Sequence, residues 1–526
     1  MRAFFREHWR PLSLLSFLGI AHILVYRGVA IDDAFIFYRY GRSLAEGYGL
    51  TFNPGQYVEG YTSPLWTLLC GLLHLFPIRA PHPWMQVIGS VFALLSAFLM
   101  YFVGRELFQG AHKGWSLFPA LLMVATPGWA HYAVSGMETS LHVCLLSGAL
   151  LLWLSSGLSW RFGVVIGLAG ICRPEIPYVF AVFVGLSWLR RFWDEDADWC
   201  WIKVAQACAI FALFWGGWLI FRLGYYGEWL PNTYFAKSTP LLEGLRSGWT
   251  YTFNYLKATY FLSLVGLLIL AALKRWKGVS IGLLWLLCCL PTLRLGSDWM
   301  PFYRFFFHYK AFELTLWAYT LWAINDRLAL ESYLRPGFLV TLYLIVCPFF
   351  LTIPTFDNAP EMNKSGLAIQ RRYKRLGLFL RKQKPHQIAL LDAGAIAYYA
   401  RVPILDLAGL TNRKIAKSPG QLHKKQFDPM YIFSQRPEWI LLRTQGKPLP
   451  PGQVKHLKIR SPKGQTVIVS LANEPFLPPR MMFPVERALY LHPVFHKAYD
   501  YVQSRTIRKH DGETSYAQHL FRLKKK

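Results

Sequence analysis

Two adjacent carboxylates, Asp32 and Asp33, directly follow the first long apolar run of the chain, Pro11 to about Ala30. As a helix this run is long enough to cross a bilayer, so both acids are expected where lipid meets water. Partial desolvation and repulsion between neighbouring carboxylates raise the proton affinity of an acid, which suits a general base near neutral pH. The alternative is helix capping, for which Asp is favoured, but a cap explains one acid and not two.

Several cations stand at the predicted external ends of apolar runs, where the positive-inside rule makes Lys and Arg less expected. Each one alone can be explained by snorkelling or by contact with lipid headgroups. Together they favour an anionic ligand, because the planar guanidinium of Arg matches phosphate oxygens. The candidates for phosphate binding are Arg39, Arg42, Arg173, Lys237, Arg294 and Arg304.

Acidic, amide and aromatic residues on the same predicted side complete the candidate substrate site. The acids stand among Gly, Pro and aromatic residues, and the alternative for each is a structural ion pair. The aromatics are typical of an interfacial belt, although a minority could stack on a sugar face. The candidates for substrate binding are Glu59, Tyr61, Glu138, Glu175, Asn232, Tyr234, Asp298, Trp299 and Tyr303.

The composition divides the chain into an apolar part and a basic part. Of the 526 residues 54% are apolar and only 16% are charged, whereas a soluble protein carries about a quarter charged residues. Residues 355–526 contain 31 Lys and Arg and 11 Asp and Glu, a net charge of +20 out of the +28 of the whole chain. We therefore expect a polytopic α-helical membrane domain over residues 1–354 and a basic soluble domain over residues 355–526.

About eleven transmembrane helices fit the hydropathy of the first domain. Lys and Arg in the short loops place the N-terminus in the cytoplasm, so the polar clusters named above and the soluble domain are expected outside. The expected spans are residues 11–30, 84–106, 115–133, 139–156, 160–172, 176–190, 201–222, 256–273, 279–295, 306–323 and 337–354.

The first external loop, residues 31–83, is expected to contain two interfacial helices. Ile36, Tyr40 and Leu44 recur at helical spacing after Asp33, which predicts an amphipathic helix in the membrane surface. The apolar segment 61–76 is too short to span a bilayer and predicts the second.

The soluble domain is predicted to be mixed α/β. Three short apolar runs are typical of buried strands, and a small helix follows the first of them. The strands are expected at residues 387–391, 437–442 and 465–471, and the helix at residues 393–399.

Between Ile31 and about Asn412, the chain resembles the GT-C superfamily of integral-membrane glycosyltransferases, and within it the branch of terminal arabinofuranosyltransferases. The motifs that carry this resemblance are DDAFIFYRYGRSLAEGYGLTFNPGQYVEGYTSPLW, SGMETSLH, CRPE, PNTYFAK, GSDWMPFYRF and LLDAGAIAYY followed by ILDLAGLTN. The resemblance implies the GT-C fold and an inverting transfer from a polyprenyl-phosphate sugar to an acceptor hydroxyl. It also implies that an acid of the first external loop is the base, which points to Asp32 or Asp33 and leaves open which one.

The expected partners are the donor lipid, a cell-envelope glycan or glycolipid as acceptor, and membrane lipids, with no nucleic acid. The expected location is the inner membrane, with the soluble domain periplasmic or extracellular. The donor carries no diphosphate, so no obligatory metal is expected, and a divalent cation stays an alternative. Two competing functions are a transporter or flippase for a lipid-linked sugar, which needs the cations but no base, and an O-antigen-type ligase with a lipid-diphosphate donor.

Overall fold

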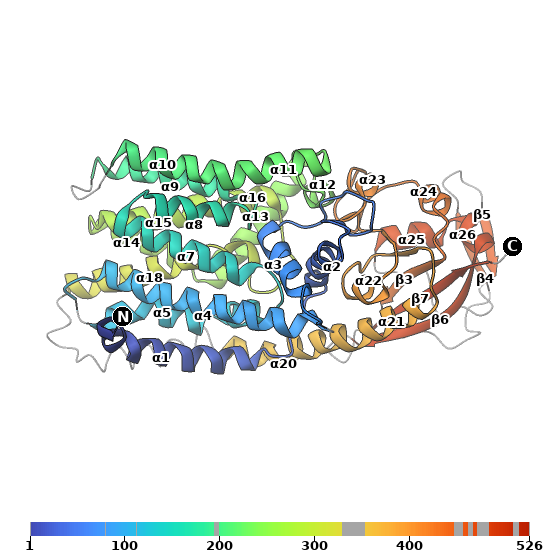
Figure 1. Ribbon diagram of the computed structural model, residues 1–526, viewed down its shortest axis with the longest axis horizontal. Helices are drawn as coiled ribbons and strands as arrows, with labels where there is room; N and C mark the ends of the chain where they lie inside the picture. Colours follow the sequence, from blue (N-terminus) through green and yellow to red (C-terminus); the bar gives the residue numbers. More distant parts are fainter. Residues whose placement is uncertain are drawn as a thin grey trace.

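The apolar runs of the chain form a helical bundle, and an α/β domain continues from one end of it (Figure 1). The N-terminus lies at the opposite end of the bundle, and the C-terminus lies at the far end of the α/β domain. This computed structural model describes residues 2–78, 80–111, 113–193, 199–328, 353–445, 456–460, 466–470, 483–508 and 515–524.

By length and hydropathy, four helices of the described chain can cross a membrane. Two further pairs of helices are bent, and counting each pair as one membrane span gives up to six spans. The bundle contains α1 (Arg2–Val25), α4 (Pro81–Leu107), α5 (Lys113–Ala125), α6 (Pro127–Val134), α7 (Thr139–Ser156), α8 (Trp160–Gly170), α9 (Ile176–Arg190), α10 (Trp201–Phe211), η1 (Ala212–Gly216), α11 (Gly217–Tyr226), α13 (Leu241–Ala258), α14 (Leu262–Ala272), α15 (Trp276–Cys289), α16 (Pro291–Leu295), α17 (Arg304–Phe307) and α18 (Lys310–Arg327).

Each expected span up to residue 323 overlaps a helix of the bundle, and the span at 337–354 lies almost entirely outside the described residues. Two expected spans are bent. The span at 115–133 turns by 60° between α5 and α6, where Pro127 cannot continue the preceding helix. The span at 256–273 turns by 72° between α13 and α14, where Tyr260 and Phe261 have positive φ angles.

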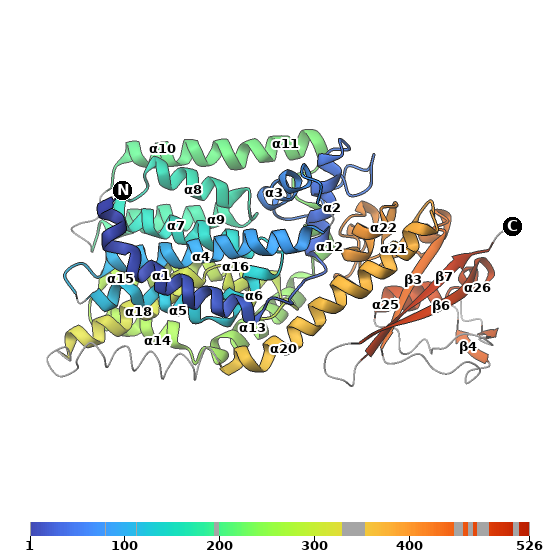
Figure 2. The same ribbon diagram turned by 60° about the horizontal axis from the view of Figure 1, so that its bottom comes forward.

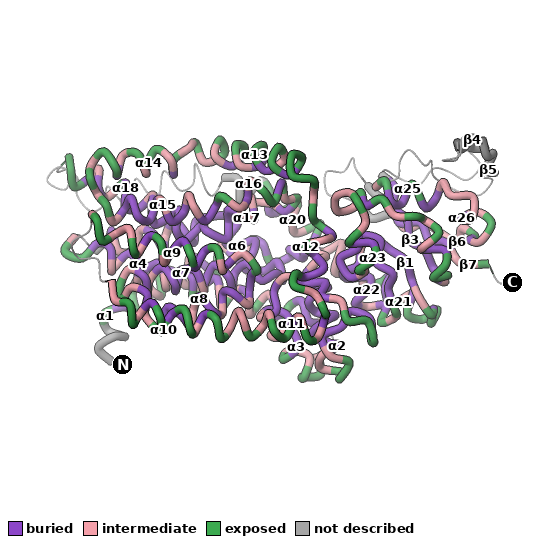
Figure 3. Tube along the Cα trace, turned by 90° about the horizontal axis from the view of Figure 1, so that it is seen from above, coloured by how far each residue is buried: buried purple, intermediate pink, exposed green. Residues whose placement is uncertain are grey.

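Many residues of the outermost helices are exposed (Figure 3), and large apolar residues are among them. Only 17% of the apolar window in the long helix of residues 201–226 is buried, and Leu213 and Ile220 are among its most exposed residues. Contiguous exposed apolar surface of this kind is suited to lipid rather than water. The protein is therefore embedded in a membrane through its helical bundle.

The first external loop contains the two expected helices, α2 (Ala34–Ala45) and α3 (Pro64–His74). We expected α2 to lie in the membrane surface, but every residue from Ala34 to Ser43 is buried. Helix α3 packs closely on one side because Gly41 has no side chain, and a Cβ there would lie 2.6 Å from the backbone of Cys70. Helix α22 (Ala395–Ala400) of the C-terminal domain covers another side.

The C-terminal domain is built on a five-stranded sheet with the order β2-β1-β3-β7-β6. Its first three strands are parallel, and β7 runs antiparallel to both β3 and β6. The expected strands and the small helix are all present. The sheet comprises β1 (Ile388–Leu390), β2 (Ile404–Asp406), β3 (Trp439–Gln445), β6 (Tyr499–Arg508) and β7 (Ser515–Leu523), and β4 (His456–Arg460) pairs with β5 (Thr466–Ser470) in a separate ribbon.

A long helical segment leads from the bundle to this sheet and lies along one side of the molecule (Figure 2). It is formed by α20 (Ile353–Ala368), η4 (Ile369–Tyr373) and α21 (Lys374–Lys382). Four more short helices cover the domain, α23 (Arg413–Ala416), α24 (Pro429–Ser434), α25 (Pro484–Tyr490) and α26 (Pro493–Ala498).

Buried polar contacts attach the C-terminal domain to the first external loop. Arg39 donates its Nη1 hydrogen to the carbonyl of Ala397 at 2.6 Å and its Nη2 hydrogen to the carbonyl of Val402 at 2.8 Å. The same guanidinium donates to Phe52 O at 2.7 Å and to Asn53 Oδ1 at 3.0 Å within the loop. All four bonds are buried or partly buried, so Arg39 joins the two domains.

We expect Arg39→Met to lower the free energy of unfolding by about 3 kcal/mol or more, because it leaves buried carbonyls of both domains without a donor. Thermal unfolding of the purified protein in detergent measures this change. The matched control is Arg401→Met at the same junction, whose side chain is exposed and only 3.5 Å from Glu46. Equal melting temperatures for the two variants would contradict this role of Arg39.

Candidate functional site

Asp32 is anchored to the C-terminal domain by two backbone hydrogen bonds. The N–H of Ala395 donates to Asp32 Oδ1 at 2.8 Å, and the N–H of Gly394 donates to Oδ2 at 3.2 Å. Both N–H groups stand at the start of α22, where a helix has donors without partners of its own. Burial and the charge of Asp392 raise the pKa of Asp32 to about 8, against the effect of the two N–H groups. Asp32 therefore joins the two domains, and its carboxyl group holds a proton more strongly than an ordinary Asp.

Asp33 has a different environment although it is the next residue. It occupies the N-cap position of α2, yet its side chain makes no capping hydrogen bond. Within the described ranges its carboxylate accepts no other hydrogen bond, and the residue is partly exposed. Burial raises the pKa of Asp33, and the positive charges of Lys237 and Arg304 oppose that rise. Helix capping thus does not explain Asp33.

Lys237 is the last residue of the short helix α12 (Asn232–Lys237), and its charge acts on Asp33. Its ammonium group makes no ion pair or hydrogen bond with any residue that the structure describes, and the side chain is exposed. Surrounding protein and the charge of Arg304 lower the pKa of Lys237, while Asp33 raises it. Lys237 is therefore a cation available to an anionic ligand beside Asp33.

The remaining central charges are already paired. Arg304 Nε donates to Asp298 at 2.7 Å, and both side chains are buried. Arg173 donates to Glu138 and to Glu175, each at 2.9 Å. The charge of Arg173 acts on both Lys237 and Arg304, so the two ion-paired groups and Lys237 form one electrostatic cluster.

Two predicted cations, Arg39 and Arg42, are directed away from this cluster. Arg42 donates to the carbonyl of Tyr398 at 2.8 Å, and its guanidinium lies 4.3 Å from the centre of that ring. Because Arg39 is likewise occupied by carbonyls, neither guanidinium is free for a phosphate. Arg294 is exposed in α16 and lies near Thr239, at the start of α13.

Besides Glu138, Glu175 and Asp298, three more of the predicted substrate-binding residues make structural contacts. Glu59 forms a buried ion pair with Arg222, in which Arg222 Nε donates to Glu59 Oε2 at 2.5 Å. Tyr61 and Tyr226 share a hydrogen bond of 2.9 Å between their hydroxyl groups. Asn232 donates to the carbonyls of Gly409 and Leu410, each at 2.8 Å, and so binds the C-terminal domain.

The predicted aromatics divide between surface and interior. Tyr234 and Trp299 are exposed. Tyr303 is partly buried, adopts a positive φ angle, and packs its ring against Tyr251 and Tyr255 of α13.

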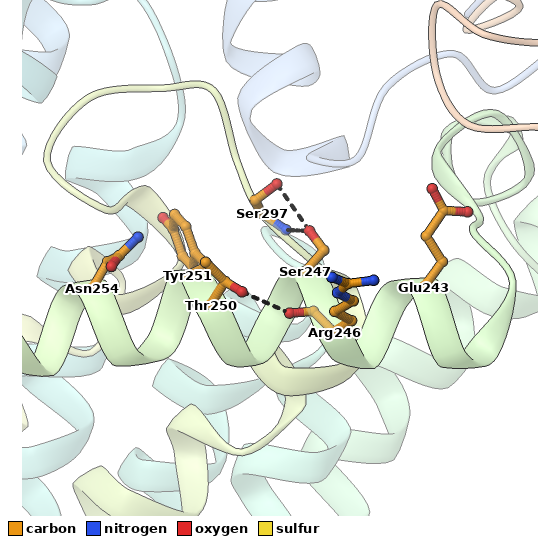
Figure 4. A pocket seen from close by; sticks show the side chains of 7 residues that line it. All are labelled: Glu243, Arg246, Ser247, Thr250, Tyr251, Asn254 and Ser297. Atoms are coloured by element: carbon orange, nitrogen blue, oxygen red, sulfur yellow. Dashed lines mark hydrogen bonds between the residues drawn. The ribbon is translucent and has the colours of Figure 1, made fainter.

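Two surface cavities follow α13 close to the cluster. One has a volume of about 440 Å³ and is lined by Arg246, Tyr251 and Ser297 among others, with a hydrogen bond of 3.0 Å from Ser247 to Ser297 (Figure 4). The other, of about 620 Å³, reaches Tyr303, which precedes Arg304. Neither cavity is lined by Asp33 or Lys237.

The structure adds residues that sequence reasoning missed. Asp392, Arg443 and Glu486 form a charged cluster behind Asp32. An acid directly after the buried strand β1 was a signal for Asp392, whereas the apolar context of Arg443 gave none. Among the described residues, no group of three or more His, Cys, Asp and Glu side chains is arranged to hold a metal ion.

Two curated proteins that are similar to this chain are named terminal β-(1→2)-arabinofuranosyltransferases. It is 28% identical over 319 residues to the terminal β-(1→2)-arabinofuranosyltransferase of Corynebacterium glutamicum, covering 51% of this chain and 45% of that one. It is 29% identical over 236 residues to the Mycobacterium tuberculosis protein of the same name, covering 39% and 34%. The chain thus spans less than half the length of either curated relative.

The oligosaccharyltransferase of Archaeoglobus fulgidus has a similar structure, with a TM-score of 0.56 at 14% identity over 95% of this chain and 80% of that one. The same enzyme in complex with an inhibitory peptide and a dolichol-phosphate gives a TM-score of 0.53 at 12% identity, over the same shares. The chain has the same fold as this oligosaccharyltransferase and is similar in sequence to the two terminal arabinofuranosyltransferases. Residues 365–513 also match the family model described as a domain of unknown function, DUF8728.

The anchoring of Asp32 can be measured by amide hydrogen exchange. We expect Asp32→Ala to increase the rate of amide hydrogen exchange at Gly394 and Ala395 by about 10–100-fold. The substitution removes the hydrogen bonds to the Asp32 carboxyl group that protect these two N–H groups. Mass spectrometry of peptides covering residues 390–398 gives the rates.

The control is Asp33→Ala, because the Asp33 side chain forms no hydrogen bond with the N–H groups of Gly394 and Ala395. Its exchange rates at 394–395 should equal those of the unmodified protein. The same acceleration in both variants would show that the two acids do not differ as described.

Proposed function

We propose that this protein is an inverting glycosyltransferase that moves a sugar from a polyprenyl-phosphate donor to a hydroxyl group of a cell-envelope glycan or glycolipid. The observation that carries the proposal is that the carboxylate of Asp33 and the ammonium group of Lys237 act on each other electrostatically, while neither makes an ion pair or a side-chain hydrogen bond with another described residue. Such a transfer needs a base for the acceptor and a positive charge for the phosphate. The names of the relatives support the reaction class.

Asp33 is the proposed base. It removes the proton of the acceptor hydroxyl as the oxygen attacks the anomeric carbon, and the bond to the phosphate oxygen breaks on the opposite face of the sugar. A raised pKa strengthens a carboxylate as a proton acceptor near neutral pH. Asp32 is less suited to this role, since both of its oxygens accept hydrogen bonds from α22.

Lys237 and Arg304 are proposed to stabilise the departing polyprenyl phosphate, whose negative charge grows as the bond breaks. Cations already in place at developing charge contribute much of the rate of such reactions. Arg173 acts on both cations and is proposed to support them, with Glu138 and Glu175 holding its guanidinium.

The lipid donor is supported by the fold and by the surface of the molecule. The archaeal oligosaccharyltransferase with the same fold was solved with a dolichol-phosphate. In this chain the apolar bundle would accommodate the lipid tail, and α12, whose last residue is Lys237, lies at the end of the bundle beside the C-terminal domain (Figure 1). We propose that this end faces the periplasm or the cell exterior, at the inner membrane.

We expect Asp33→Asn to lower kcat by about 10²–10⁴-fold, the contribution of a general base. Purified protein, a polyprenyl-phosphate sugar and an acceptor glycan are the components of the assay. The variant should melt at the same temperature as the unmodified protein, because Asp33 makes no hydrogen bond that the substitution removes.

Asp500→Asn is the control for the loss of a charge, since Asp500 is exposed in β6 and, among the described residues, forms an ion pair with Lys524 at 3.4 Å and with no other side chain. Full turnover by Asp33→Asn would show that Asp33 is not the general base. Product formed only from a lipid-diphosphate donor would indicate the ligase, and movement of an unchanged lipid-linked sugar across vesicles would indicate the transporter.

A further inference from the structure

A second group of buried charges lies in the C-terminal domain, behind the loop that binds Asp32. Asp392 follows β1, and Arg443 lies on the neighbouring strand β3. The Nη1 atom of Arg443 forms an ion pair with Asp392, and its Nε donates to Glu486 Oε1 at 3.2 Å. Glu486 lies in α25 and is fully buried. Three elements of the domain thus each contribute one charged side chain.

Packing alone does not account for this cluster. Burying charges costs free energy, and well-packed apolar residues often replace a buried ion cluster without loss of stability. Two carboxyl groups, those of Asp392 and Glu486, share the one guanidinium of Arg443. In the part of the chain that is described, Arg443 Nη2, Glu486 Oε2 and Gln518 Oε1 are buried without a hydrogen-bond partner, whereas most buried polar atoms in proteins are paired.

Asp392 connects the cluster to the candidate site. Its Oδ2 accepts hydrogen bonds from the hydroxyl of Tyr373 at 3.0 Å and from Gln518 Nε2 at 3.1 Å, so its carboxylate is held in one orientation. Two residues later, Gly394 donates its N–H to Asp32. A side chain at position 394 would collide with Asp32, because a Cβ would lie 2.1 Å from the Asp32 carbonyl oxygen and 2.5 Å from its carboxyl carbon.

We propose that the ion pair of Asp392 and Arg443 is a positioning element of the transfer site, which holds the loop that binds Asp32 and sets the charge that surrounds Asp32 and Asp33. This inference rests on the proposed function. It assigns to the C-terminal domain a part in the reaction beyond covering the site. The charge of Asp392 acts on both aspartates, and the charge of Arg443 acts on Asp32.

Charged groups from every neighbouring element face these aspartates. His423 is neutral near pH 7, because burial and the charge of Arg443 lower its pKa to about 4. The charged groups that act on the aspartates are Lys237, Asp298 and Arg304 from the bundle and Asp392 and Arg443 from the C-terminal domain. Glu486 contacts Arg443, and burial raises its pKa to about 7.

The test is the pH dependence of transfer by the full-length protein with a polyprenyl-phosphate sugar as donor. The rate must fall as the pH decreases through the pKa of the base. Asp392→Asn removes a negative charge, lowers that pKa and moves the acidic limb to lower pH. Arg443→Gln removes a positive charge, raises that pKa and moves the limb to higher pH. Each shift should be at least about half a pH unit, or about threefold in rate at a pH on the limb.

Glu438→Gln is the matched control, since Glu438 precedes β3 and forms an ion pair with Arg522 at 3.3 Å. The acidic limb of the pH–rate profile of this variant should stay at the pH of the unmodified protein. If Arg443→Gln fails to fold, Glu486→Gln replaces it and should move the limb to lower pH by removing a negative charge. Unmoved limbs, or shifts in the same direction for Asp392→Asn and Arg443→Gln, would overturn the inference. Absence of turnover by the unmodified protein would instead overturn the proposed function.

Discussion

The hydrogen bonds from Gly394 and Ala395 to Asp32 connect the first external loop to the C-terminal domain. The arrangement of the candidate site depends on this connection. These hydrogen bonds orient the carboxyl group of Asp32 toward α22. The next side chain along the chain, Asp33, is then left without such bonds and experiences the charges of Lys237 and Arg304. Two adjacent and chemically identical residues therefore have different environments, one as a link between domains and one as an accessible carboxylate.

Charge pairing separates the cations in the same way. Arg39 and Arg42 are occupied by backbone carbonyls, and Arg304 is held by Asp298. A phosphate that approached any of these would have to compete with an existing partner. Lys237 has no such partner in the described part of the chain, so its charge is the one most readily neutralised by a ligand.

The features that follow from local pattern were predictable from the sequence. Hydropathy located the helices of the bundle, and apolar runs located β1 and β3. The acidic pair was predicted at the end of the first apolar run. What the pattern could not supply were contacts between distant segments. The amphipathic spacing around Tyr40 does not reveal that α22 covers α2, and an arginine at position 39 looks the same whether it meets a phosphate or a carbonyl 358 residues away. Arg443 was missed for the same reason, because its partners lie on other elements.

The central claim is that Asp33 and Lys237 face one another across the place where the donor phosphate binds. An experimental structure of the protein with polyprenyl phosphate tests this most directly. We expect the phosphate oxygens to lie within hydrogen-bond distance of Lys237, with Arg304 on the same side and the Asp33 carboxylate facing the position of the anomeric carbon. A phosphate bound instead at the cavities along α13, beyond the reach of Lys237, would contradict the account.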